Sequence, residues 1–298
     1  MSTEGFFCAD QARLRGDSMI GTAAPAVTWV LIEHRGGWPP NGFDGLDLDP
    51  AVKSAVNDAA RTHRARILLI RRHGRRSRGG PAAWAVLRHD RSGTYRQRWG
   101  TWTDDHDLAA LPSALEDAHL ASTESPPVLL VCAHAQHDVC CAVRGRPVAQ
   151  SLTERWPDLV WECSHVGGDR FAANLVVVPD GVYYGNLDVS TAVATVEQHL
   201  AGQITPDRLR GYSDLIPPQQ CAVVETLRRY GPAGRHDLHV VDTTRDGDRW
   251  TVRLVGDILP GPVTVELLAH RTAPHQLTCR GLQPSSAVHY EVVDLRLS

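Results

Sequence analysis

Residues 132–169 collect side chains that bind soft metals. Four of the seven cysteines and three histidines lie in this stretch: Cys132, Cys140, Cys141, Cys163, His134, His137 and His165. Thiolate and imidazole are the ligands that iron–sulfur clusters, zinc and copper prefer. The sequence therefore predicts a metal or redox site here.

The members of this group differ in what they can contribute. Cys140 and Cys141 are adjacent, so their side chains cannot easily point the same way. We expect one of them to pack in the core and the other to be a candidate ligand. His134 and His137 follow a predicted strand, and we expect them to be solvated or to contact the ligands rather than to bind metal.

The residues after His165 allow two interpretations. Gly167 and Gly168 permit the close backbone approach that a cluster-binding loop needs, but an ordinary turn needs it too. Arg170 places a fixed positive charge next to the candidate ligands, where it could tune a redox centre. An ordinary ion pair explains Arg170 equally well.

Composition limits the class of protein. The net charge of -3, with 42% hydrophobic and 22% charged residues, is ordinary for a soluble protein and gives no overall attraction to nucleic acid or membrane. The longest apolar runs, 128–133 and 175–179, are far shorter than the roughly 20 residues of a membrane helix. An acidic N-terminus and an odd number of cysteines favour a reducing compartment. We predict a cytoplasmic protein without a membrane segment.

One basic run, residues 71–78, is the strongest candidate for a nucleic-acid contact. It contains no interleaved aromatic residues, and the chain as a whole is acidic. We therefore interpret it as a solvated loop that could at most contact an acidic redox partner or a phosphate-bearing donor.

Strands and helices that could position the site follow one layout twice. In the first half, apolar runs, helical spacing and turn residues predict a strand, a helix, three strands and a helix, at 27–33, 50–64, 67–70, 82–88, 94–99 and 108–120. The second half repeats this order at 128–132, 147–155, 159–162, 174–178, 182–185 and 188–200. The pattern predicts an α/β fold with an internal repeat, and only the second copy carries the cysteines.

The remainder of the chain predicts a small α+β region. A helix is expected at 217–230, followed by strands at 238–242, 249–255, 263–269, 276–279 and 289–297. We predict three domains: 1–121, 122–203 with the metal site, and 204–298.

Three motifs carry a resemblance to a known family. Residues 131–147, 161–174 and 178–185 resemble the sucrase/ferredoxin-like family, specifically over 128–203 and more weakly over the first half, through Cys8 and residues 21–33. That family is related to the thioredoxin-like 2Fe-2S ferredoxins. The resemblance implies two thioredoxin-like halves in tandem, a degenerate first half, and a 2Fe-2S cluster in the second.

The resemblance also implies a ligand set. By position, Cys132 and Cys141, or Cys140 in its place, supply the first pair of ligands, and His165 supplies the third. Asp169 stands where fungal relatives have a second histidine. Because a carboxylate is a harder ligand than imidazole, Cys163 is an alternative fourth ligand.

Three functions are compatible with these residues. The leading hypothesis is an electron carrier that serves an unidentified redox partner. A thiol oxidoreductase or redox sensor could use Cys132 with Cys140 or Cys141, although the chain has no Cys-x-x-Cys motif. The third possibility is an interaction module. It would either be free of metal or hold zinc through Cys132, Cys141, Cys163 and His165. No pair of carboxylates suggests a sucrase.

Overall fold

The computed structural model describes residues 5–74, 80–89, 96–117 and 126–297. The chain forms two compact units. We call residues 26–166 and 175–181 the repeat unit, and residues 1–25, 167–174 and 182–298 the terminal unit. These units divide the chain differently from the three predicted domains, and that three-part division stays a prediction.

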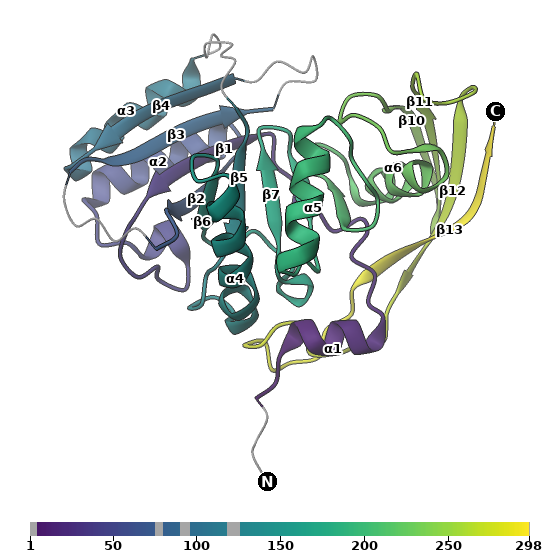
Figure 1. The fold of residues 1–298 in the computed structure, drawn as a ribbon, viewed down its shortest axis with the longest axis horizontal. Coiled ribbons are helices and arrows are strands. Elements are labelled where there is room, and N and C mark those ends of the chain that lie inside the picture. Colours follow the sequence, from purple (N-terminus) through teal and green to yellow (C-terminus); the bar gives the residue numbers. More distant parts are fainter. Residues whose placement is uncertain (1–4, 75–79, 90–95, 118–125, 298) are drawn as a thin grey trace. The chain divides into compact units, whose positions relative to one another are not determined.

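The first copy of the repeat follows the predicted order of elements (Figure 1). Strand β1 runs parallel to β2 and antiparallel to β3, and β3 pairs antiparallel with β4. The elements are β1 (Thr28–Glu33), α2 (Pro50–Thr62), β2 (Ala65–Arg71), β3 (Ala82–Arg88), β4 (Arg96–Trp102) and α3 (Ala110–Glu116). Residues 90–93, between two predicted strands, lie outside the described residues, as do the second half of the basic run (75–78) and the end of the helix predicted over 108–120.

The second copy has the same pairing. Strand β5 (Val128–Cys132) is parallel to β6 (Val160–Cys163) and antiparallel to β7 (Leu175–Val178). An antiparallel contact between β2 and β6 joins the two copies, so the strands of the repeat unit lie in the order β4-β3-β1-β2-β6-β5-β7. The predicted mixed α/β architecture is confirmed.

Buried strands give the repeat unit its core. Every residue of β1 and every residue of β5 is buried, as expected for central strands that are covered on both faces. Helix α2 begins at Pro50 because Asp49 accepts hydrogen bonds from the amides of Ala51 and Val52. Its apolar face then packs Val52 into the same core.

Helix α4 differs from the sequence prediction. It spans Val139–Arg155, so it begins well before the predicted start at residue 147. Asp138 caps it by accepting a hydrogen bond from Cys140 N at 2.8 Å. Pro147 lies inside the helix on its exposed side, and so does Val143. Because proline has no N–H group, the carbonyl of Val143 has no hydrogen-bond donor within the helix. Water can hydrate that carbonyl, so the proline does not end the helix.

The terminal unit combines short helices with two groups of strands. Strand β8 (Val182–Tyr184) pairs antiparallel with β9 (Leu209–Tyr212), and β10, β11, β12 and β13 form a separate antiparallel sheet in that order. Its further elements are α1 (Cys8–Arg15), η3 (Asp169–Phe171), α5 (Val189–Leu200), α6 (Pro217–Tyr230), β10 (His239–Asp246), β11 (Arg249–Val255), β12 (Val263–Arg271) and β13 (Val288–Leu297).

One prediction for this unit fails, and one of its helices was not predicted. Residues 276–279 form no strand, and the nearest ladder contact is an isolated bridge between His275 and Ser285. The sequence also gave no sign of helix α1, whose mixed polar surface lacks an amphipathic pattern. No helix in the described residues is long and apolar enough to cross a membrane.

Candidate metal centre

Three of the predicted ligands converge within the repeat unit. Cys132 ends β5, Cys141 lies in the first turn of α4, and His165 follows β6. One ligand atom from each, the two Sγ atoms and an imidazole nitrogen, lies within 4.8 Å of the others. The parallel pairing of β5 and β6 brings their carboxyl ends to one edge of the sheet, and this pairing produces the convergence.

The surroundings of Cys132 favour its thiolate form. A hydrogen bond from the Cys141 side chain holds the pKa of Cys132 well below its usual value, although burial acts in the opposite direction. A hydrogen bond and the positive charge of His165 lower this pKa further. Because the thiolate is the metal-binding form of cysteine, Cys132 is prepared to be a ligand.

The alternate cysteines have different surroundings. Cys163 lies directly opposite Cys132 in the β5–β6 ladder, but it is not part of the 4.8 Å group. Burial, and secondarily the neighbouring Cys132 thiolate, raise the pKa of Cys163 well above its usual value. Cys140 is also outside this group, because adjacent helix residues point about 100° apart.

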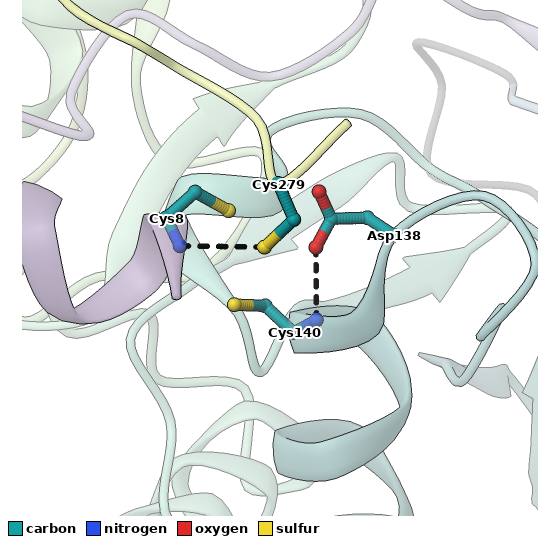
Figure 2. Close-up of side chains that lie close together, drawn as sticks. All are labelled: Cys8, Asp138, Cys140 and Cys279. Atoms are coloured by element: carbon teal, nitrogen blue, oxygen red, sulfur yellow. Dashed lines mark hydrogen bonds between the residues drawn. The ribbon is translucent and has the colours of Figure 1, made fainter. Parts of the chain in front are cut away.

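The backbone amides of two cysteines donate hydrogen bonds to side chains (Figure 2). Within the repeat unit, Cys140 N donates to Asp138 Oδ1. Within the terminal unit, Cys8 N donates to Cys279 Sγ at 3.4 Å. The remaining cysteine, Cys221, is a packed thiol whose pKa burial raises to about 12.

Of the two roles expected for His134, solvation or contact with a ligand, its burial and its hydrogen bond with His165 fit the second. Its Nε2 lies 2.8 Å from Pro39 O, and its Nδ1 accepts a hydrogen bond from His165 N at 3.3 Å. These two contacts fix a neutral tautomer with the proton on Nε2, and burial lowers the pKa of His134, which favours that neutral form. His134 therefore holds the backbone of a candidate ligand.

His137 contacts the same ligand through its ring. The His137 and His165 rings stack with their centroids 3.7 Å apart and their planes inclined by 18°. His137 Nδ1 also lies 3.2 Å from Pro40 O. Pro39 and Pro40 thus contact the histidines of the second repeat copy through carbonyl oxygens, and no side-chain pattern in the sequence predicts such contacts.

Gly145 is a site residue that the sequence analysis missed. A Cβ atom at this position would lie 2.0 Å from Cys132 O, so only glycine lets α4 approach β5 this closely. Gly145 is four residues after Cys141 and therefore on the same face of the helix. An isolated glycine inside a helix was the available signal.

The remaining predicted residues belong to the terminal unit. Gly168 has a φ of 77°, and a Cβ there would lie 2.4 Å from an Arg210 guanidinium nitrogen. Asp169 is buried at the start of η3, and its role as the fourth ligand stays a prediction. Arg170 pairs with Asp17 at 3.6 Å, which is the ordinary ion pair that was one of its two interpretations.

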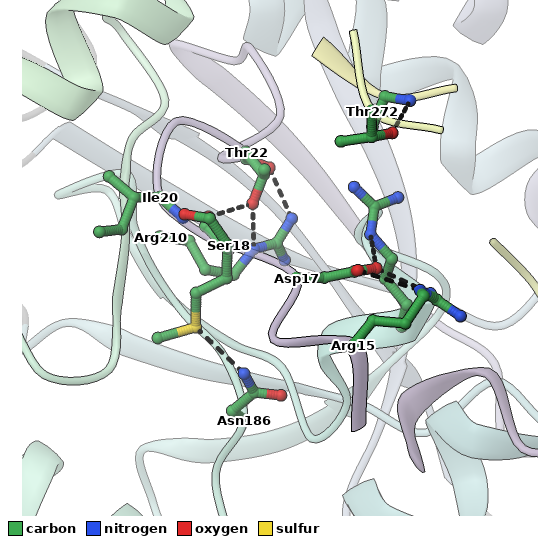
Figure 3. A network of polar contacts seen from close by, with 11 residues as sticks. Arg15, Asp17, Ser18, Ile20, Thr22, Asn186, Arg210 and Thr272 are labelled. Atoms are coloured by element: carbon green, nitrogen blue, oxygen red, sulfur yellow. Dashed lines mark hydrogen bonds and ion pairs between the residues drawn. The ribbon is translucent and has the colours of Figure 1, made fainter. Parts of the chain in front are cut away.

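Arg210 holds the loop at Gly167 in place through hydrogen bonds. This buried arginine donates to Gly167 O at 2.9 Å and to Asn174 Oδ1 at 2.8 Å, and it also donates to Thr22 Oγ1 at 3.0 Å (Figure 3). The guanidinium therefore ties the loop to β9 within the terminal unit.

The donor set fits a soft metal. Two thiolates and an imidazole suit iron in a sulfur cluster or zinc, and they do not suit hard cations such as magnesium or calcium. A family model described as sucrase/ferredoxin-like matches residues 19–211, a range that contains Cys132, Cys141 and His165. No curated protein and no solved structure matches the chain.

Proposed function

Since the chain belongs to the sucrase/ferredoxin-like family, we propose that Cys132, Cys141 and His165 hold a 2Fe-2S cluster and that the protein carries electrons. The observation that supports this most strongly is the convergence of these three side chains on one edge of the sheet. A bound cluster would supply one-electron chemistry, and Asp169 is our candidate for its fourth ligand.

Surrounding residues have defined tasks in this proposal. His134 orients the His165 backbone, and Arg66 donates to His165 O at 2.9 Å. Cys132 and Cys141 are fully buried, whereas His165 is only partly buried. The side on which His165 lies is therefore where a redox partner can come nearest the cluster.

Zinc is the second candidate, favoured by the compactness of the group. Tetrahedral zinc with Zn–S bonds of about 2.3 Å keeps its ligand atoms less than about 4 Å apart. Three atoms within 4.8 Å of one another are near that spacing. Cys163 would be the fourth ligand, although its raised pKa opposes the thiolate form.

Thiol chemistry is the third candidate, favoured by the hydrogen bond between Cys141 and Cys132. A lowered pKa at one cysteine with a second cysteine beside it is the arrangement of a reversible disulfide. Both side chains are buried, however, and a redox-active thiol needs access to its partner. We therefore rank this function below metal binding.

Anaerobic purification tests the proposal. We expect a coloured protein with equal amounts of iron and acid-labile sulfide, about two of each per chain as a 2Fe-2S cluster requires. Cys132→Ser, Cys141→Ser and His165→Ala should each lose most of the iron, while the control Cys221→Ser, at a buried thiol of the terminal unit, should keep it. Zinc without iron would favour the second candidate. A colourless, metal-free protein after reconstitution would exclude the proposal.

The fourth ligand needs its own comparison. We expect Asp169→Ala to alter the visible spectrum and to make the iron easier to remove with a chelator, whereas Cys163→Ala should leave both unchanged. The opposite result would transfer the role to Cys163.

A further inference from the structure

A cavity of about 430 Å³ opens beside His165 within the repeat unit. Residues 40–44 and helix α2 of the first repeat copy form one side, and the segments that follow β5 and β6 form the other. Small-molecule sites commonly have volumes of about 300–1,000 Å³. The cavity is therefore large enough for a small ligand, and neither copy could form it alone.

Positive charge predominates in the lining. Arg61 and Arg66 contribute two guanidinium groups, whereas Asp44 is the one carboxylate among the lining residues. Asn57 Nδ2 donates to Asp44 Oδ1 at 3.0 Å, which satisfies part of that acceptor. Arg61 pairs with Asp58 at 3.1 Å, but both side chains are largely exposed, and such a pair stabilises little. Arg61 can therefore turn to an anion in the cavity at little cost.

Arg66 connects the cavity to the candidate metal centre. Its Nη2 donates to His165 O, and this bond occupies one of its five N–H groups. The planar guanidinium fork matches the oxygens of a carboxylate or phosphate, which it can bind through two parallel hydrogen bonds. His137, stacked on His165, forms the adjoining wall.

We propose that this cavity binds a small molecule bearing a carboxylate or phosphate group, held by Arg61 and Arg66 next to His165. Binding itself does not depend on a metal. The role of the ligand as a small-molecule electron donor or acceptor rests on the proposed function, because it would then lie beside a ligand of the cluster. The first repeat copy would in that case supply the substrate site for a centre in the second.

Calorimetric titration of the metal-free protein tests this inference, with inorganic phosphate and citrate as separate probes. We expect saturable binding of at least one probe at one site per chain. Arg61→Gln and Arg66→Gln should each weaken it tenfold or more, and Asp44→Asn should strengthen it by removing a like charge. Arg146→Gln, at an exposed arginine of α4 outside the cavity, should leave it unchanged. Binding of phosphate alone would identify a phosphate ester, and binding of citrate alone a carboxylate.

Two results would overturn the inference: no binding of either probe, or binding that both arginine variants leave within twofold of the unsubstituted protein. Arg61 is exposed, so Arg61→Gln should fold even if Arg66→Gln does not, and circular dichroism checks this. Because the protein is free of metal, failure here leaves the cluster proposal intact, and absence of iron leaves the anion site intact.

Discussion

His134 lies outside the group of candidate ligands, yet it positions one of them, His165. Its ring spans the gap between Pro39 O and His165 N, with hydrogen-bonding distances of 2.8 and 3.3 Å. Both partners are backbone groups. The sequence could therefore place His134 among the side chains gathered at residues 132–169, but it could not show that His134 positions His165. Contacts of this kind depend on backbone positions that only the folded chain defines.

Replacing His134 should weaken metal binding without removing a ligand. We expect His134→Phe, which keeps most of the volume but loses both hydrogen bonds, to lower metal affinity by about 10–100-fold. Competition with a chelator measures this affinity. His106→Phe, at an exposed histidine of the short helix η2 (Asp105–Ala109), is the matched control. Equal affinities for the two variants would show that His134 does not position the ligand.

Elements differ in how far the sequence predicted them. The strands β1 and β5 were predicted well because they are apolar runs buried on both faces. The start of α4 was misjudged because Pro147 suggests a first helical position, whereas Asp138 provides the actual cap. This difference matters for the site, since it places Cys141 on a rigid helix instead of in a loop.

The contact between α4 and β5 depends on Gly145. We expect Gly145→Ala to destabilise the protein by about 1–3 kcal/mol, because the added methyl group would overlap Cys132 O and force the two elements apart. Val143→Ala, at an exposed position of the same helix, should change stability by no more than about 0.5 kcal/mol. Urea denaturation measures both. A Gly145→Ala protein as stable as the control would show that α4 can shift freely.

Helix α5 supplies a prediction about pH. Asp188 caps this helix, and a hydrogen bond from Thr191 N is the main reason that its pKa falls to about 2. A lowered carboxyl pKa stabilises the folded chain fully above the unfolded value of about 3.8, and this contribution disappears as the pH falls towards 2. At neutral pH, Asp188→Ala should cost about 0.5–2 kcal/mol, and Asp188→Asn much less, because asparagine also caps helices.

Thermal unfolding of these variants at pH 7 and pH 2.5 checks the sign. The difference between the unsubstituted protein and Asp188→Ala should shrink at pH 2.5, because this pH lies between the unfolded and the folded pKa of Asp188, where much of the contribution of the charged cap is already lost. An undiminished difference would mean that the charge of Asp188 contributes nothing.

At the scale of the whole molecule, the two copies of the repeat contribute different groups to the candidate site. The second copy carries the cysteines, and the first provides the carbonyls of Pro39 and Pro40 and the guanidinium of Arg66. The repeat itself was visible in the order of predicted elements. The contacts between the two copies could not be predicted, because they join residues about 100 positions apart in the sequence. Local sequence patterns carry no information about such pairs.

We therefore expect metal binding to depend on the junction between the two copies as well as on the ligands. At the β2–β6 contact, buried Glu162 accepts from Arg71 at 2.8 Å and lies 2.7 Å from His73 Nδ1. Glu162→Ala leaves Arg71 partly buried without its counter-charge. We expect it to destabilise the protein by about 3 kcal/mol, the lower end of the range for a buried pair, because Arg71 keeps some exposure.

Urea denaturation followed by tryptophan fluorescence, together with metal content, measures this effect. Both the unfolding midpoint and the metal retained should fall in Glu162→Ala, because separation of β2 from β6 also displaces the segment that carries His165. Glu154→Ala, at an exposed carboxylate of α4, should preserve both. A lowered midpoint with full metal content would show that the second copy builds the centre without support from the first.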